Sequence, residues 1–472
     1  MSARDPELAP TFAAIVGEDA VATSPSELLR HGSDESYHQP ALPDIVVYPH
    51  STDEVVRVVA ECRRLSLPIV PFGAGTSLEG HVTAVLGGIS LDMTRMNRIV
   101  EVRIPDLDVT VEPGVTRLQL DAALRPEGVF FPVDPGADST VGGMISTGAS
   151  GTTTVRYGTM RENVVSLTVV LADGAVVRTR SRARKSSAGY DLTQLFVGAE
   201  GTLGVITEAV LRLHPTPEAM TAAVCSFPSV RRAVECVIAT IQMGIGVARA
   251  ELLDEVQMGA VIRRHQLAYA EAPTLFFELH GSRSAVEEQE DELRSLAETF
   301  GARDFVRATD ERERRRLWEA RHRAYEAALA MRPGARGLLT DVCVPLSRLA
   351  ECVEATRHDI DASGLTAPIV GHAGDGNFHV ILVIDPNRPD ELDRAKHLSE
   401  RLVRRAIEMD GTSTGEHGVG IGKRSFLELE HGPAAVELMR SIKRSFDPDN
   451  RFNPGKILPD QASADPAYTR AG

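Results

Sequence analysis

Residues 71–80 read Pro-Phe-Gly-Ala-Gly-Thr-Ser-Leu-Glu-Gly and follow a short apolar run at 68–70 that is typical of a strand. A glycine-rich loop after a strand lets backbone N–H groups approach a phosphate, because no Cβ stands in the way. A dinucleotide fingerprint would need a third glycine at Leu78 and an amphipathic helix after Gly80, and the sequence has neither. Asp92 lies where a ribose-binding acid is expected, so an NAD-dependent enzyme remains an alternative at this point.

Two further glycine-rich segments favour a different, more extended ligand. From Pro132 the chain reads Pro-Val-Asp-Pro-Gly-Ala-Asp-Ser-Thr-Val-Gly-Gly-Met-Ile-Ser-Thr-Gly-Ala-Ser-Gly-Thr, and residues 196–207 read Phe-Val-Gly-Ala-Glu-Gly-Thr-Leu-Gly-Val-Ile-Thr. So many glycines with interleaved hydroxyls predict a surface that wraps a ligand with backbone and side-chain hydrogen bonds. Any one segment alone would more often only form turns. The three segments together decide against the NAD alternative.

The chain changes its pattern near the sequence His-Pro-Thr-Pro at 214–217. Before it, an apolar run at 45–48, a capping box at 51–54 and apolar residues at helical spacing as far as Leu65 predict a strand followed by a helix. After it, strand-like runs alternate with polar helix-like stretches, which predicts an antiparallel sheet with helices on one side. The expected strands are 221–227, 274–280, 338–344 and the two arms around residue 375, and the expected helices are 284–299 and 311–331.

Residues 371–379 read Gly-His-Ala-Gly-Asp-Gly-Asn-Phe-His between two apolar runs. This predicts a hairpin with a two-residue turn at its Asp-Gly pair, which would place His372 opposite His379 on one face, about 5 Å apart at Cβ. Glu416, in Gly-Glu-His-Gly at 415–418, is the candidate third ligand. Two imidazoles and a carboxylate suit Zn²⁺, Mn²⁺ or Fe²⁺. The alternative is a polar hairpin face with an incidental histidine pair.

The chain has 472 residues, of which 25% are charged and 43% hydrophobic, and a formal net charge of -15. This length predicts two or three domains, and the acidic balance argues against nucleic acid or an anionic membrane surface as the main partner. The five cysteines form no Cys-x-x-Cys pair, the N-terminus lacks the apolar core of a signal peptide, and no apolar run reaches the ~18 residues of a membrane span. We therefore expect a cytoplasmic protein without a membrane span, and we leave open a homodimer.

The three glycine-rich segments resemble the FAD-binding half of the vanillyl-alcohol oxidase flavoprotein superfamily. The resemblance implies an FAD domain of two subdomains that holds the pyrophosphate at residues 73–77. Some members attach the flavin covalently to a histidine in or near the first loop, and residues 73–80 contain none, so we expect non-covalent FAD. The FAD contacts implied by the resemblance, including one in a returning C-terminal segment, are Pro71, Gly73, Ala74, Gly75, Thr76, Ser77, Gly80, Pro135, Gly136, Thr140, Gly142, Gly143, Gly148, Ser150, Gly201, Ile206 and Asn453.

The second half adds a closer resemblance. The sequences at 371–379, 415–420, 340–345 and 452–456 are similar to those of the cytochrome-type D-lactate dehydrogenases, which share their architecture with glycolate oxidase D-subunits and D-2-hydroxyglutarate dehydrogenases. The resemblance implies a divalent metal, Zn²⁺ or Mn²⁺, and a D-2-hydroxy acid as substrate. The residues that it implies for this chemistry are the metal ligands His372, His379 and Glu416, the base His417 and the carboxylate clamp Arg321.

The predicted fold class is therefore α+β, with a two-subdomain FAD-binding domain and an antiparallel-sheet α+β substrate cap. The expected division is an N-terminal arm at 1–39, the FAD domain at 40–216, the substrate and metal cap at 217–445 and a C-terminal segment at 446–472 that returns to the FAD domain.

Three positions at which the chain departs from the hydroxyglutarate-type relatives bear on the substrate. Leu339 and Ile381 stand where those relatives carry polar side chains, and Tyr325 replaces a smaller hydroxyl residue. A second carboxylate there would be left unpaired, so we expect a monocarboxylate with a small or apolar tail. No haem motif or cysteine-rich cluster is present, so the electron acceptor is external: a cytochrome, a quinone or an electron-transfer flavoprotein. The alternatives are a glycolate oxidase FAD subunit, a D-2-hydroxyglutarate dehydrogenase and a non-catalytic FAD-binding module.

Overall fold

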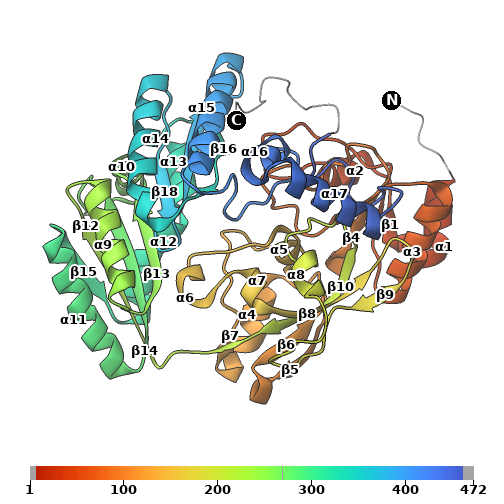
Figure 1. Ribbon diagram of the computed structural model, residues 1–472, viewed down its shortest axis with the longest axis horizontal. Helices are drawn as coiled ribbons and strands as arrows, with labels where there is room; N and C mark the ends of the chain where they lie inside the picture. Colours follow the sequence, from red (N-terminus) through yellow and green to blue (C-terminus); the bar gives the residue numbers. More distant parts are fainter. Residues whose placement is uncertain (1–6, 268, 461–472) are drawn as a thin grey trace.

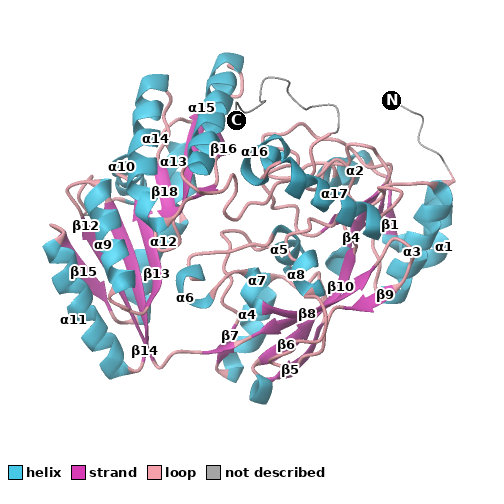
Figure 2. Ribbon diagram, viewed as in Figure 1, coloured by secondary structure: helices cyan, strands magenta, loops and turns pink. Residues whose placement is uncertain are grey.

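The computed structural model describes residues 7–267 and 269–460. The chain forms two lobes (Figure 1): the N-terminal lobe runs from red to yellow, and the second lobe from green to medium blue. The darkest blue helices, near the C-terminus, return across the first lobe. Both lobes combine sheets with helices (Figure 2), which confirms the predicted α+β class, and the second lobe is built on the predicted antiparallel sheet.

The first subdomain is built on a four-stranded sheet of order β1-β2-β4-β3. Ser51 caps α3 by accepting the N–H of Glu54, and the apolar face of α3 is buried against this sheet. Within the predicted N-terminal arm, 1–39, β1 pairs with β2 and the buried His31 of α2 hydrogen-bonds Asp92, while residues 1–6 of that arm lie outside the described residues. The elements are α1 (Leu8–Val16), β1 (Val21–Ala22), α2 (Pro25–His31), β2 (Ile45–Val47), α3 (Thr52–Leu65), β3 (Ile69–Phe72) and β4 (Ile89–Asp92).

The second subdomain is a five-stranded antiparallel sheet of order β5-β6-β10-β8-β9 with short helices beside it. Its strands are β5 (Ile99–Arg103), β6 (Asp108–Val111), β8 (Val164–Val170), β9 (Val176–Arg178) and β10 (Val205–Arg212), and a small ribbon pairs β7 (Val129–Phe130) with β11 (His214–Pro215). Its helices are α4 (Arg117–Leu124), α5 (Val141–Thr147), α6 (Thr154–Tyr157), α7 (Met160–Asn163) and α8 (Leu192–Phe196).

The cap is one antiparallel sheet of order β15-β12-β14-β13-β18-β19-β16, with β17 also paired to β19. Its strands are β12 (Ala219–Ser226), β13 (Val247–Leu253), β14 (Thr274–Gly281), β15 (Arg303–Ala308), β16 (Arg336–Leu339), β17 (Val342–Cys343), β18 (Ile369–His372) and β19 (Asn377–Ile384). Its helices are α9 (Val230–Gln242), α10 (Glu255–His265), α11 (Arg283–Thr299), α12 (Glu311–His322), α13 (Ala324–Ala330), α14 (Leu349–Ser363) and α15 (Pro389–Glu408).

The expectation of helices on only one side of this sheet was wrong. One core packs α9, α11, α14 and α15 against one face, and a second core packs α10, α12 and α13 against the other. Strand β19 shows the reason, because every residue from Asn377 to Ile384 is buried, so both faces of the strand must be covered. The continuous apolar run at 380–384 carried this signal in the sequence.

The hairpin between β18 and β19 closes in a different register from the predicted one. His372 pairs with Asn377, and His379 pairs with Val370, so residues 373–376 form a four-residue connection. The neighbouring strand β13 holds this turn in place, because the N–H of Gly374 donates to the carbonyl of Ala250. The two histidines still share one face as diagonal neighbours, with ring centroids 5.5 Å apart.

Two other predicted elements are interrupted. The expected helix 311–331 breaks at Arg323 into α12 and α13, and the expected strand 338–344 breaks at Thr340 and Asp341 into β16 and β17. The interruption at Arg323 borders the cavity described below, whereas Thr340 and Asp341 are fully buried and bind neighbouring segments through their side chains. Thr340, for example, accepts the Val380 N–H with its side-chain oxygen.

The C-terminal part of the chain returns to the first lobe before residue 446. Helices α16 (Leu427–His431) and α17 (Pro433–Phe446) lie over that lobe in Figure 1. Phe446 packs edge-on against Phe196, and Lys443 donates to the carbonyl of Thr202. The exact domain boundaries stay a prediction, but these contacts place residue 443 on the FAD side.

The hairpin turn yields a stability prediction. Gly376 has φ +78°, and a Cβ there would lie 2.2 Å from the carbonyl oxygen of Val344, so Gly376→Ala should cost at least about 2 kcal/mol. Gly128 has a similar φ of +69° with nothing within 4 Å of a Cβ, so Gly128→Ala is the matched control and should cost about 1 kcal/mol. Melting temperatures of the FAD-loaded variants measure both, and equal losses would contradict the expected clash.

Candidate active site

A cavity of about 2010 Å³ lies between the two lobes. Its walls come from the three glycine-rich segments on one side and from α12, β18 and β19 on the other. Ordinary small-ligand sites occupy roughly 300–1,000 Å³, so this cavity has room for a dinucleotide and a second small ligand. The predicted cofactor residues that line it are Pro71, Gly73, Ala74, Gly75, Thr76, Ser77, Pro135, Gly136, Thr140, Gly142, Gly143, Ser150, Gly201, Ile206 and Asn453.

The first two glycine-rich segments touch each other at the cavity wall. The hydroxyls of Thr76 and Ser139 are hydrogen-bonded at 2.9 Å, and a Cβ on Gly73 would lie 2.2 Å from Oγ1 of Thr140. Gly136 lines the cavity, and no atom stands within 4 Å of where its Cβ would be. These glycines therefore let the two segments meet while leaving backbone groups open to a bound phosphate or ring.

Two of the predicted cofactor residues, Gly80 and Gly148, lie outside the cavity lining. A Cβ on Gly80 would come within 2.6 Å of Ile421, so this glycine permits close packing against a later segment of the chain. Gly148 ends α5 with φ +67°, a conformation that glycine adopts at low cost. Both glycines thus have a backbone role that does not depend on a cofactor.

Asn453, in the C-terminal segment, reaches the cavity between two other segments. Its Nδ2 donates to the carbonyls of His81 and Glu200, at 3.1 and 2.8 Å. Its buried Oδ1 has no partner among the described residues. An orphaned acceptor at the wall of a cavity is what a site that binds a hydrogen-bonding ring would leave in the absence of that ring.

His372, His379 and Glu416 come together as the sequence predicted. Nε2 of His372 lies 3.3 Å from Oε1 of Glu416, and Nε2 of His379 lies 3.1 Å from the same oxygen. The three candidate ligand atoms lie within 4.8 Å of one another. Ser150, predicted as a flavin contact, donates to Oε2 of Glu416 at 2.5 Å and so links this group to the FAD lobe.

The outer ring nitrogens of both histidines are held from behind. Nδ1 of His372 lies 2.7 Å from Glu251, which stands directly opposite on β13, and Nδ1 of His379 lies 3.1 Å from the carbonyl oxygen of Thr340. Burial alone would lower the pKa of His372, but without a metal the carboxylates of Glu251 and Glu416 outweigh it and raise that pKa. In the neutral ring that a metal requires, Nδ1–H donates in this way and the lone pair of Nε2 points toward Glu416. The donor set and its support therefore fit a divalent ion with open positions.

Glu251 also binds Arg321, the predicted carboxylate clamp. Oε2 of Glu251 accepts from Nε of Arg321 at 2.8 Å and from Nη2 at 2.5 Å. Burial alone would raise the pKa of Glu251, but the charges of His372 and Arg321 outweigh it and lower that pKa. Arg321 lines the cavity, and Nη1 is the guanidinium nitrogen that Glu251 does not engage. The sequence missed Glu251, because a single acid in an apolar strand gives no sign of its partners.

His417 lies beside the histidine pair and lines the cavity. Its ring stacks on His379 with centroids 4.9 Å apart and an interplanar angle of 10°, and Nδ1 is buried without a hydrogen-bond partner among the described residues. Burial lowers the pKa of His417 to about 4, against the opposing pull of Asp341. The imidazole is therefore neutral at pH 7 and able to accept a proton.

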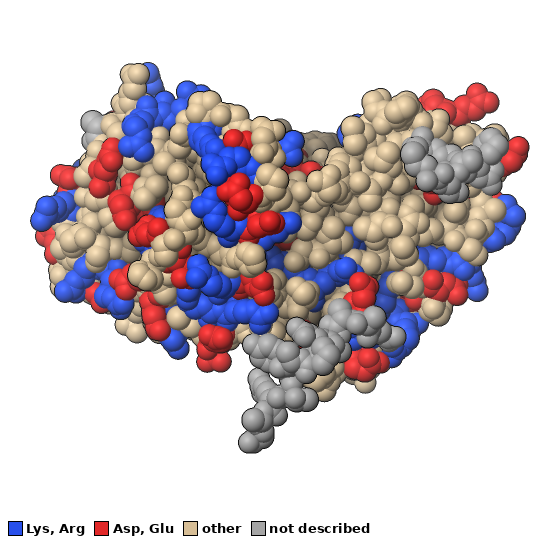
Figure 3. All heavy atoms as spheres, turned by 90° about the horizontal axis from the view of Figure 1, so that it is seen from above, with Lys and Arg blue, Asp and Glu red and all other residues tan. Residues whose placement is uncertain are grey.

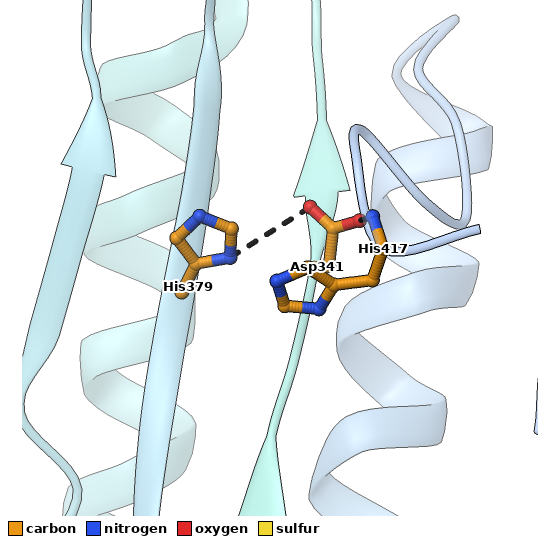
Figure 4. A group of neighbouring side chains, drawn as sticks. All are labelled: Asp341, His379 and His417. Carbon is orange, nitrogen blue, oxygen red and sulfur yellow. Dashed lines mark hydrogen bonds and ion pairs between the residues drawn. The ribbon is translucent and has the colours of Figure 1, made fainter. Parts of the chain in front are cut away.

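Asp341 is the second residue that the sequence did not single out. Figure 4 shows its carboxylate between His379 and His417, with Oδ1 3.7 Å from Nδ1 of His379. The carboxylate accepts the backbone N–H groups of Glu416 and His417, each at 2.8 Å. Asp341, His379 and His417 are also close enough to hold an ion. However, the N–H groups of Glu416 and His417 already occupy the carboxylate of Asp341. Asp341 therefore supports the backbone that carries these two residues.

Comparisons with known proteins agree with this site. A family model described as FAD linked oxidases, C-terminal domain, matches residues 216–457, and a model of an FAD binding domain matches residues 43–180. This chain belongs to the FAD-linked oxidase family. The predicted FAD-dependent oxidoreductase is thereby confirmed, as are the flavin cofactor and the vanillyl-alcohol oxidase type of fold.

Several curated relatives are similar over nearly the whole chain. A probable mitochondrial D-lactate dehydrogenase of Danio rerio is 51% identical over 451 residues, which is 95% of this chain and 91% of the relative. A mitochondrial D-lactate dehydrogenase (cytochrome) of Arabidopsis thaliana is 46% identical and covers 94% of this chain and 78% of the relative. The glycolate oxidase subunit GlcD of Bacillus subtilis is 35% identical, with 89% of each covered.

The solved structures support the fold alone. A p-cresol methylhydroxylase with bound substrate matches with a TM-score of 0.80 at 19% identity and covers 96% of both chains. An alkyldihydroxyacetonephosphate synthase matches with a TM-score of 0.77, also at 19% identity, covering 96% of this chain and 86% of the synthase.

Two findings bear on where the protein is located in the cell. In the described part of the chain no helix combines the length and the apolar composition needed to cross a membrane. The two most similar relatives quoted above are mitochondrial by name, so the cytoplasmic location expected from the sequence gains no support from them and stays a prediction.

The Glu251 network yields a testable consequence. Glu251→Gln removes the negative charge between His372 and Arg321, and a broken buried ion pair costs about 3–5 kcal/mol. The matched control is Glu437→Gln, because Glu437 and Arg444 form an ion pair with both side chains more than half exposed, worth at most about 1 kcal/mol. Melting temperatures at one FAD concentration compare them, and an equally small loss in both variants would contradict the role of Glu251.

Proposed function

We propose that this chain oxidises a D-2-hydroxy acid, with D-lactate as the preferred type, to the 2-oxo acid, and that it needs both FAD and a divalent ion, Zn²⁺ or Mn²⁺. The observation that carries the proposal is the convergence of His372, His379, Glu416 and His417 on a cavity walled by the three glycine-rich segments. The names of the Danio rerio and Arabidopsis thaliana relatives support the choice of D-lactate.

The side chains divide the chemistry between them. Oxidation of a 2-hydroxy acid removes the hydroxyl proton and a hydride from C2; bound FAD supplies the hydride acceptor, and a bound divalent ion supplies Lewis-acid polarisation of the hydroxyl. His417 accepts the hydroxyl proton, because its ring is neutral and Nδ1 has no hydrogen-bond partner among the described residues. Arg321 holds the substrate carboxylate with the guanidinium edge that Glu251 leaves unengaged. His372, His379 and Glu416 are the residues that would hold the ion.

The walls around the substrate tail favour a monocarboxylate. Leu339 and Ile381 stand directly opposite each other on β16 and β19, and both line the cavity. Ile381 lies two residues after His379 on the same strand and therefore on the same face. Tyr325 also lines the cavity, and its ring packs so close to Gly337 that a Cβ there would lie 2.7 Å away. None of these three side chains offers a positive charge to a second carboxylate.

The electron acceptor of the second half-reaction is proposed to be external. A cytochrome is favoured, because the name of the Arabidopsis thaliana relative includes the word, and a quinone or an electron-transfer flavoprotein is the alternative. The homodimer and the cytoplasmic location remain predictions from the sequence. A glycolate oxidase subunit is the second candidate, favoured by the similarity to GlcD of Bacillus subtilis.

The primary test is anaerobic reduction of the bound flavin. We expect D-lactate to bleach the flavin absorbance of the purified protein, L-lactate to leave it, and prior removal of metal with a chelator to abolish the bleaching until Zn²⁺ or Mn²⁺ is restored. Faster bleaching by glycolate would favour the second candidate. A flavin that stays oxidised with every 2-hydroxy acid would establish the non-catalytic module, and full activity without metal would exclude the Lewis-acid role.

The neutral His417 predicts an unusual pH profile. Because its pKa is lowered to about 4, the basic form is lost only as the pH falls through about 4, so the limiting rate of flavin reduction should be level between pH 5.5 and pH 8. An ordinary histidine would lose half of its basic form near pH ~6.5. Stopped-flow measurements decide, with His417→Ala as the control that should retain FAD and lose reduction. A descending limb centred near pH ~6.5 would contradict the assignment.

Substrate preference provides a further prediction. D-2-Hydroxyglutarate would place its second carboxylate against Leu339 and Ile381, and an unpaired buried charge costs several kcal/mol, so kcat/KM should fall at least about 100-fold relative to D-lactate. D-2-Hydroxybutyrate, which lengthens the tail without charge, is the matched control and should stay within about tenfold. Comparable rates for D-lactate and D-2-hydroxyglutarate would overturn the monocarboxylate assignment.

A further inference from the structure

The loop at 414–420, Thr-Gly-Glu-His-Gly-Val-Gly, carries Glu416 and His417 and runs between the two lobes. Its first half is held by the cap. Oδ2 of Asp341 accepts from the hydroxyl of Thr414 at 2.7 Å and from the N–H groups of Glu416 and His417 at 2.8 Å each. Oδ1 of Asp341 accepts from the side chain of Asn377 at 2.8 Å. Asp341 is completely buried, so these bonds are shielded from water.

The second half of the loop is held by the FAD lobe. Oε1 of Glu200 accepts the N–H of Val419 at 2.6 Å, and Oε2 accepts the N–H of Gly420 at 2.9 Å. The Glu200 residue is 5% exposed. Two consecutive N–H groups on the two oxygens of one buried carboxylate make strong, charge-assisted bonds. Asp341 of the cap therefore holds one end of the loop, and Glu200 of the FAD lobe holds the other end.

Glu200 is itself fixed by the flavin-binding segments. Its N–H donates to the carbonyl of Ser146 in α5, and its carbonyl accepts from Nδ2 of Asn453. Glu200 and its neighbour Gly201 both line the cavity. The carboxylate that holds the loop thus belongs to the same wall that would contact the flavin.

The glycines of the loop permit this close approach. Gly418 has φ +82°, and a Cβ there would lie 2.7 Å from Nε2 of His81 and 2.8 Å from Oε1 of Glu200. A Cβ on Gly415 would lie 2.2 Å from Nδ2 of Asn377, the side chain that binds Asp341. A side chain at either position would push the loop away from its carboxylate. These two glycines therefore permit the loop to pack closely against the residues that surround both carboxylates.

We propose that Asp341 and Glu200 are positioning residues that clamp the loop 414–420 between the lobes and so set Glu416 and His417 against the flavin. This inference rests on the proposed function for its effect on catalysis, but the clamp itself concerns backbone N–H groups and does not depend on any bound metal. Neither carboxylate touches the reacting atoms in this scheme. Their effect is exerted through the loop.

The isosteric amides test the clamp. In Glu200→Gln one of the two accepting oxygens becomes an NH₂ group, which donates instead of accepting, so one loop N–H loses its partner. Asp341→Asn removes the negative charge that strengthens three bonds to Oδ2, although its NH₂ group can face Asn377 in place of Oδ1. Because Asp341 is fully buried, Thr414→Val gives a milder second variant that removes only the hydroxyl bond to Asp341. The matched control is Glu290→Gln, which changes an equally buried carboxylate that binds Arg294 and Arg307 away from the loop.

Two readouts are measured on the FAD-loaded proteins. Hydrogen–deuterium exchange reports on the amides of residues 416–420, and stopped-flow reduction by D-lactate reports the limiting rate and the KM separately. We expect exchange in this peptide to rise at least tenfold in Glu200→Gln and Asp341→Asn, and to rise by a smaller factor in Thr414→Val. The limiting rate should fall about 10–100-fold in the two amide variants with FAD content and KM little changed. Glu290→Gln should match the wild-type protein in both.

Each outcome decides a separate point. Unchanged exchange in both amide variants would show that the carboxylates do not hold the loop, and faster exchange with an unchanged limiting rate would show that the clamp has no bearing on catalysis. Either result would overturn the inference. If the wild-type protein is not reduced by D-lactate at all, the proposed function fails, whereas the exchange comparison still decides whether the clamp exists.

Discussion

The site depends on buried carboxylates that are each compensated from more than one side. Glu251 lies between His372 and Arg321, and Asp341 accepts from a hydroxyl, an amide and two backbone N–H groups. An isolated buried carboxylate would be too costly to retain its charge. Here each carboxylate is stabilised by the groups that donate to it, and it fixes the orientation of those groups in return. The hydrogen bonds that offset the cost of burial therefore also position the side chains of the site.

The two-lobe construction explains why the reactive groups lie at the boundary. The FAD lobe supplies a cavity wall of glycine-rich segments, and the cap supplies a rigid sheet from which His372 and His379 project. On the face seen in Figure 3, Lys and Arg side chains are interspersed with Asp and Glu side chains. In the proposed function, recognition rests on the lining of the cavity, where Arg321 offers a positive charge to the substrate carboxylate and Leu339 and Ile381 limit the substrate tail.

Much of the fold and of the candidate site can be predicted from the sequence, and the predictions that differ from the structure have clear physical causes. The glycine-rich segments and the His372, His379 and Glu416 group were found because short motifs keep their chemistry whatever the exact register. The hairpin register was wrong, because Gly374 pairs with Ala250 on a strand more than a hundred residues away. Gly80 and Gly148 lie outside the cavity lining, and their role in cofactor binding stays a prediction, because a packing glycine and a ligand-facing glycine look alike in one sequence.

By itself, the sequence determined the fold class, the flavin and the identity of the candidate ligands, because each of these depends on local patterns of residue types. Only the tertiary structure decided that Glu251 stands behind His372, that Asp341 and Glu200 hold opposite ends of the same loop, and that the cap sheet is covered on both faces. Glu200 and Gly420 are separated by 220 positions in the chain. Contacts of that range arise from the packing of whole lobes, and no periodicity or spacing in the sequence records them.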